Sequence, residues 1–124
     1  MIVLFACIHN SGRSVAAQVI ARSLGLDARS AGSEPGAGVN PVVAEVLAER
    51  GLSVDTHVPT LLTHELVEGV DVVVTMGCGE TCPYFPGKQY EDWKVDDPKG
   101  QPIEVVRAIV DDIDACVRAL AARV

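Results

Sequence analysis

The chain has 124 residues, of which 48% are hydrophobic and 22% charged, and its formal net charge is −7. This length and composition predict one globular domain, residues 1–124, with its own hydrophobic core. The negative charge argues against a nucleic-acid partner, because phosphate backbones bind basic surfaces. No apolar run approaches the ~20 residues of a membrane span, and the apolar start is too short for a signal peptide, so we expect a cytoplasmic protein without a membrane partner.

The first half of the sequence alternates between strand and helix patterns. Residues 1–6 are an apolar strand, and residues 15–24 repeat apolar side chains at helical spacing. Residues 27–31 predict a weaker second strand, and residues 32–38 have the composition of a loop. Pro41, directly after an asparagine, is typical of the first position of a helix.

The second half repeats this alternation. Residues 63–67 predict a short helix, and residues 70–76 are apolar almost throughout, as in a buried parallel strand. Pro102 opens a final helix. One apolar stripe follows that helix: Ile103, Val106, Val110, Ile113, Val117 and Leu120.

Strands that alternate with helices predict an α/β fold, with a parallel sheet covered on both faces. Open sheets of this kind bind ligands beyond the carboxyl ends of their strands. The loop that follows the first strand, residues 7–14, therefore lies where a ligand site is expected.

This loop combines a thiol with a guanidinium. Cys7 opens it and Arg13 closes it. Free N–H groups at a helix N-terminus bind anions, and a guanidinium matches the oxygens of a tetrahedral oxyanion. The same field favours the thiolate form of Cys7. We therefore predict a sulfur nucleophile that faces a bound oxyanion. The alternative is a buried cysteine with a structural arginine, which the position between strand and helix disfavours.

The pattern Cys7-x5-Arg13-Ser14 resembles the signature of the low-molecular-weight tyrosine phosphatase fold. Together with residues 75–83 (TMGCGETCP) and 96–98 (DDP), it is similar to the arsenate reductases built on that fold. The resemblance covers nearly the whole chain. It implies a three-layer sandwich around four parallel strands in the order 2-1-3-4, with the fourth strand near residues 88–93. It also implies an oxyanion held by the loop residues Ile8, His9, Asn10, Ser11, Gly12, Arg13 and Ser14.

An aspartate before a proline is the candidate general acid. When a thiolate attacks an oxyanion centre, the oxygen that leaves does so more readily if it is protonated. In the resembled family the acid directly precedes the proline, which is Asp97 in this chain. Asp-Pro pairs are also common in turns, so a purely structural role is the alternative.

Two further cysteines, Cys78 and Cys82, distinguish reduction from hydrolysis. In the resembled reductases a second cysteine attacks the first and a third attacks the second, which here gives the order Cys7, Cys78, Cys82. Each exchange needs a thiolate within reach of a disulfide sulfur. Inert packing of these thiols or a zinc site are the alternatives.

The resemblance implies arsenic detoxification, with arsenate or another tetrahedral oxyanion as substrate and thioredoxin as electron donor. We expect a monomer with no bound cofactor and no metal site. A low-molecular-weight thiol such as mycothiol is the alternative donor, and a low-molecular-weight protein tyrosine phosphatase is the alternative enzyme. We assign Cys116 to the core and no function to His57 or His64.

Overall fold

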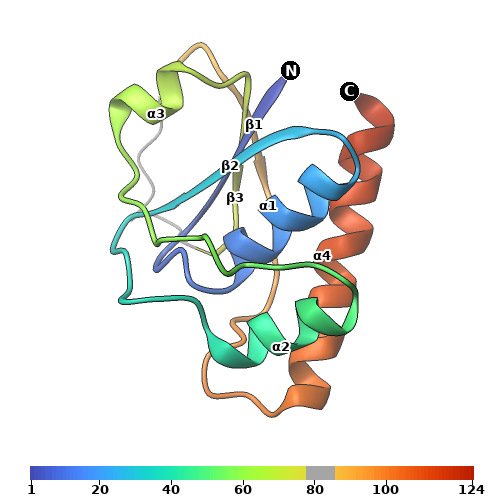
Figure 1. The fold of residues 1–124 in the computed structure, drawn as a ribbon. Coiled ribbons are helices and arrows are strands. Elements are labelled where there is room, and N and C mark those ends of the chain that lie inside the picture. Colours follow the sequence, from blue (N-terminus) through green and yellow to red (C-terminus); the bar gives the residue numbers. More distant parts are fainter. Residues whose placement is uncertain (78–85) are drawn as a thin grey trace.

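Figure 1 shows the computed structural model, which describes residues 1–77 and 86–124. Four parallel strands form one sheet in the order β2-β1-β3-β4. This order and the α/β class confirm the prediction. The elements in chain order are β1 (Ile2–Cys7), α1 (Arg13–Ser23), β2 (Asp27–Gly32), α2 (Pro41–Glu49), α3 (His64–Glu68), β3 (Val72–Thr75), β4 (Gln89–Asp92) and α4 (Ile103–Arg123).

The strands differ in how deeply they are buried. β1 lies between β2 and β3, and its residues from Val3 to Cys7 are all buried. β4 pairs with β3 alone, and none of its four residues is buried. An edge strand with this burial can be polar, which is why the fourth strand has a weak sequence signal.

Side-chain caps fix the starts of two helices. The side chain of Asn40 accepts hydrogen bonds from Val42 N at 2.9 Å and Val43 N at 3.3 Å, and Pro41 occupies the first turn of α2. Thr63 Oγ1 accepts from Leu66 N at the start of α3. Both caps satisfy N–H groups that a helix leaves unpaired.

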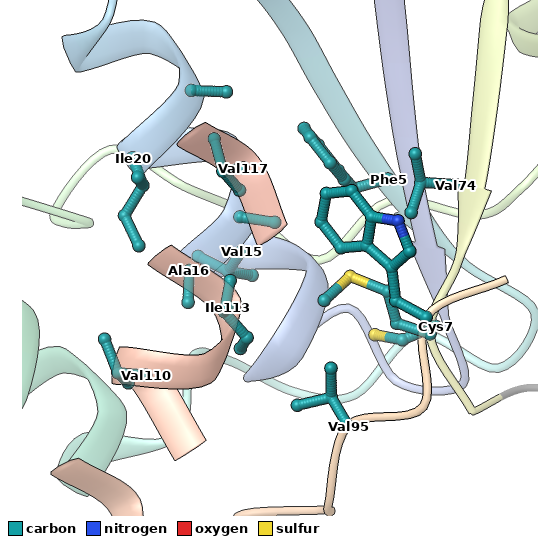
Figure 2. Close-up of a cluster of buried hydrophobic side chains, with 14 of the residues drawn as sticks. Phe5, Cys7, Val15, Ala16, Ile20, Val74, Val95, Val110, Ile113 and Val117 are labelled. Carbon is teal, nitrogen blue, oxygen red and sulfur yellow. The ribbon is translucent and has the colours of Figure 1, made fainter. Parts of the chain in front are cut away.

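Most of the core lies on one face of the sheet, where α4 packs against α1 and α2 (Figure 1). Figure 2 shows Phe5, Cys7 and Val74 of the strands beside Ile113 and Val117 of α4. The predicted α4 stripe is buried from Val106 onward, with Ile109 added to it and Ile103 only partly buried.

The other face of the sheet carries a smaller cluster under the short helix α3. It consists of Leu4, Ala31, Val67, Val70 and Val73. Helices therefore cover both faces, as predicted. Within the described ranges, no helix is both long and apolar enough to span a bilayer.

Candidate active site

Backbone hydrogen bonds to its carbonyl groups hold the loop between β1 and α1 in place. The segment 33–40 donates four backbone hydrogen bonds to this loop, to the carbonyl oxygens of Cys7, Ile8, His9 and Ser11, at 2.7 to 3.2 Å. In the described part of the chain, the backbone N–H groups of His9, Ser11, Gly12 and Arg13 have no protein acceptor. Such a loop, followed by a helix N-terminus, presents donors to an anion.

Gly32, the last residue of β2, makes this arrangement possible. A Cβ atom at Gly32 would lie 2.5 Å from the carbonyl oxygen of Ile8 and 2.8 Å from Asn10 N. Any larger residue would therefore displace the backbone of the loop.

Cys7 ends β1 with its side chain buried and hydrogen-bonded. Its Sγ accepts from Asn10 N at 3.3 Å and lies 2.8 Å from Ser14 Oγ. Ser14 Oγ already accepts from Asn10 Nδ2 at 2.8 Å, so the hydroxyl hydrogen is free to point at the sulfur. With the Ser14 hydroxyl as donor, the sulfur has two hydrogen-bond donors, which favour a negative charge on it.

Asn10 connects this sulfur to a distant segment. It is fully buried, with a positive φ of 51°. Its Oδ1 accepts from His57 Nε2 at 3.0 Å and from Thr60 N at 3.0 Å. Because an amide oxygen only accepts, His57 must be the donor, so its ring carries hydrogen on Nε2. Burial lowers the pKa of His57, the hydrogen bond to Asn10 opposes this, and the nearby charge of Arg22 lowers it further.

Arg13 is the first residue of α1 and is 8% exposed. Its Nη1 donates to the carbonyl oxygen of Val95 at 3.4 Å, and its Nη2 lies 3.8 Å from Asp97 Oδ2. Gly77, after β3, touches the guanidinium: a Cβ at Gly77 would collide with Arg13 Nη1, and the φ of Gly77 is +82°. Glycine at position 77 therefore leaves the space that this guanidinium occupies.

Asp97 reaches the same place from the loop before α4. Its side chain is 52% exposed, and its Oδ1 accepts from Lys99 N at 3.0 Å. The ring of Pro98 packs above Gly12, where a Cβ would approach Pro98 Cγ to 3.0 Å. Asp97 is thereby kept beside Arg13 but open to solvent.

These groups surround a pocket of about 40 Å³. Its size suits a small inorganic ion. A sulfur, a guanidinium and a carboxylate form part of its wall. Its lining residues are Cys7, His9, Ser11, Gly12, Arg13, Asn40, Asp97 and Pro98.

The structure separates the predicted loop residues into two sets. His9, Ser11, Gly12 and Arg13 line the pocket, whereas Asn10 and Ser14 are buried behind it. Ile8 does not line it. The His9 ring is 2.9 Å from the carbonyl oxygen of Glu34, which ties it to the neighbouring loop.

The predicted relay residues Cys78 and Cys82 lie outside the described residues. Cys116 lies on α4, is partly buried and packs against the core, and burial raises the pKa of its thiol. It is not one of the residues that line the pocket, and its packing agrees with its assignment to the core.

Sequence reasoning missed His57 and Thr60. Both lie in an irregular segment about fifty residues after the loop that they support. No periodicity or motif marks them, because their role depends on two single hydrogen bonds made across the fold.

Comparison with known proteins places this site in a family. The family model for low molecular weight phosphotyrosine protein phosphatase matches residues 2–124. The chain belongs to this family. A putative arsenate reductase of Halobacterium salinarum is 33% identical over 118 residues, which cover 89% of this chain and 83% of the relative. A glutaredoxin arsenate reductase of Synechocystis is 30% identical, over 98% of this chain and 97% of the relative.

One solved structure is a thioredoxin-dependent arsenate reductase of Corynebacterium glutamicum. It is 38% identical with a TM-score of 0.83, and the match covers 96% of this chain. This chain spans 59% of the length of that protein.

Proposed function

We propose that this chain is an arsenate reductase in which Cys7 is the nucleophile. The Cys7 thiolate attacks the arsenic of arsenate, and an oxygen leaves as water with a proton from Asp97. Arg13 and the free N–H groups of the loop hold the remaining oxygens. The observation that carries the proposal is that one small pocket joins a hydrogen-bonded sulfur, a buried guanidinium and a half-exposed carboxylate.

The choice of arsenate rests on the relatives. Phosphate and arsenate have the same shape and charge, so the pocket geometry suits both. The Halobacterium, Synechocystis and Corynebacterium relatives carry arsenate reductase names. An aromatic pair beside Asp97, which would grip a phosphotyrosine ring, is missing from the sequence.

Reduction requires two electrons, which we assign to the thiols of Cys78 and Cys82. The Cys78 thiolate attacks Cys7 Sγ, a sulfur–sulfur bond forms, and the sulfur–arsenic bond breaks with its electron pair left on arsenic. Arsenite leaves and arsenic has been reduced from the +5 to the +3 state. Cys82 then attacks Cys78, which frees Cys7 and leaves a Cys78–Cys82 disulfide. We propose that the dithiol of thioredoxin reduces this disulfide.

Two other functions start from the same pocket. A low-molecular-weight thiol could resolve the arsenic adduct in place of Cys78. In a phosphatase, which the family model favours, water would hydrolyse a phosphocysteine and Cys78 and Cys82 would have no task.

A single turnover separates these functions. Fully reduced protein is mixed with arsenate without added thiol, and released arsenite and new disulfides are measured together. We expect about one arsenite per chain and a Cys78–Cys82 disulfide. Cys78→Ser should block release, and Cys82→Ser should trap a Cys7–Cys78 disulfide. Cys116→Ser is the matched control and should release arsenite like the wild type.

Other outcomes would contradict parts of the proposal. Arsenite that appears only after a small thiol is added would remove Cys78 and Cys82 from the mechanism. No arsenite under either condition, with rapid hydrolysis of a phosphate ester, would identify a phosphatase.

A further inference from the structure

A second pocket, of about 370 Å³, lies behind the nucleophile loop, and we call it the rear pocket. It shares no lining residue with the Cys7 pocket. His57 and Thr60, which hold Asn10, form part of its wall. Its other polar lining includes Gln18 and Arg22 of α1 and Arg29 and Ser30 of β2.

The charge of the rear pocket is positive on a protein whose net charge is −7. Arg22 and Arg29 both line it, and none of the described residues that line it is acidic. Arg29 Nε lies 4.0 Å from Asp27 Oδ1, an exposed and therefore weak ion pair.

Arg22 is oriented by the backbone. Its Nε donates to the carbonyl oxygen of Ala28 at 2.8 Å, which fixes the plane of the guanidinium. Its two terminal nitrogens have no acceptor in the described part of the chain. A guanidinium held in this way has a fork of donors ready for an oxyanion.

Gln18 adds a further donor. It is 5% exposed and lines the rear pocket. Its Oε1 accepts from Ser30 Oγ at 2.6 Å, so its amide NH₂ is left without an acceptor among the described residues. The nitrogen is not fully enclosed, so a group bound in the rear pocket can accept from it.

We propose that the rear pocket is a second oxyanion site, separate from the one beside Cys7. Arg22, Arg29 and the Gln18 amide supply the donors. The ligand class is a sulfate, phosphate or carboxylate group, either as a free ion or as part of a larger molecule. This inference does not depend on the reaction proposed for Cys7.

The three histidines of the chain provide the probes. His57 lines the rear pocket, His9 lines the Cys7 pocket, and His64 lies on α3 outside both. Sodium sulfate is added to the full chain, and the ring resonances of all three histidines are followed by NMR. We expect the ring resonances of His57 and His9 to shift with different midpoints in sulfate concentration. The resonances of His64 should shift least.

Paired variants assign each shift to its pocket. In R22Q/R29Q, the sulfate midpoint at His57 should rise roughly tenfold or more, while the midpoint at His9 changes little. In Arg13→Leu, the sulfate midpoint at His9 should rise, while the midpoint at His57 changes little. The matched control is R50Q/R118Q, which removes the same charge from exposed ion pairs with Asp111 and Asp114 and should leave the His57 midpoint unchanged.

Repeating the titration with sodium glycerol 3-phosphate distinguishes the source of the oxyanion. If glycerol 3-phosphate binds more tightly than sulfate, the natural ligand is a phosphate group on a larger molecule. If it binds more weakly, the natural ligand is a free ion. A His57 midpoint that follows His9 in every variant, or that R22Q/R29Q leaves unchanged, would overturn the proposal. So would a His57 shift with potassium chloride at concentrations where sodium sulfate gives none.

Discussion

Hydrogen-bond direction explains how single residues prepare Cys7. Thr60 N–H and His57 Nε2–H both donate to Asn10 Oδ1, which leaves the Asn10 NH₂ group to donate to Ser14. The Ser14 hydroxyl hydrogen is then available to the Cys7 sulfur, and it is the donor when Cys7 is a thiolate. The Asn10 backbone N–H donates to the sulfur as well, so a Cys7 thiolate has two donors beside it.

Stability should depend on pH through His57. Burial lowers its pKa in the folded protein, so the unfolded chain binds a proton more readily as the pH falls below the ordinary value of ~6.5. The unfolded state then holds more protons, and the free energy of unfolding falls as the pH decreases from there toward the folded pKa. Urea unfolding between pH 5 and 7.5 measures this slope.

His57→Gln should remove this component of the slope because glutamine does not titrate. His64→Gln, at an exposed position on α3, is the control for replacing a histidine by glutamine. Equal slopes for wild type and His57→Gln would contradict the expectation.

Gly77 is a residue at which one added methyl group should lower activity. Gly77→Ala places a Cβ against the Arg13 guanidinium and also forces a positive φ, so activity should fall at least about tenfold if Arg13 holds the oxyanion. Gly25→Ala is the matched control, because Gly25 also has a positive φ, +87°, but a Cβ there would have no atom within 4 Å. It should cost about 1 kcal/mol of stability and leave activity unchanged.

Steady-state activity and urea unfolding of both variants separate the two effects. If Gly77→Ala lost no more activity than Gly25→Ala, the contact with Arg13 would have no catalytic consequence.

At the scale of elements, local signals predicted most of the fold. Asn40-Pro41 and Thr63 mark helix starts because a cap and its helix are neighbours in sequence. The buried face of α1 has a weaker periodic pattern. Val19 is only partly buried and lines the rear pocket, whereas Ala16, Ala17 and Ala21 are fully buried. These alanines give little periodic signal, but their small size suits an interface where α1 packs against both the sheet and α4.

The nucleophile loop was predictable and its supports were not. Cys7, Arg13 and Ser14 lie within eight residues, and their chemistry can be inferred from that spacing. Gly32, His57 and Gly77 come from three other segments, and each matters through one contact that only the folded chain creates.

At the scale of the whole molecule, the last turn of α4 is tied to the edge of the sheet. Arg123 Nη2 donates to Glu91 Oε1 on β4 at 2.9 Å, and Trp93 Nε1 donates to the same oxygen at 3.2 Å. The Glu91 side chain is 18% exposed, and the hydrogen bond from Arg123 is the main reason that its pKa is lowered. This pair therefore joins the C-terminal helix to the strand that precedes Trp93 and the Asp97 loop.

Arg123→Gln should lower Tm because it takes the cationic partner away from a mostly buried carboxylate, which then keeps only neutral donors such as the Trp93 indole. Because the pKa of Glu91 is lowered in the folded protein, its ionised form stabilises the fold at pH values above the ordinary glutamate pKa. This stabilisation is lost as the pH falls through the pKa of the folded state. The Tm difference between wild type and variant should therefore be largest near pH 7 and shrink below pH ~4.

Arg118→Gln is the matched control. It breaks the i,i+4 ion pair with Asp114 on the surface of the same helix and should change Tm little at any pH. Thermal unfolding of the three proteins from pH 3.5 to 7 measures both effects. If Arg123→Gln and Arg118→Gln lowered Tm equally at pH 7, the Arg123–Glu91 pair would be no more than an ordinary surface ion pair. A larger effect of Arg123→Gln that also disappears at low pH would assign the stabilisation to the ionised Glu91, because loss of helix packing alone would not follow its titration.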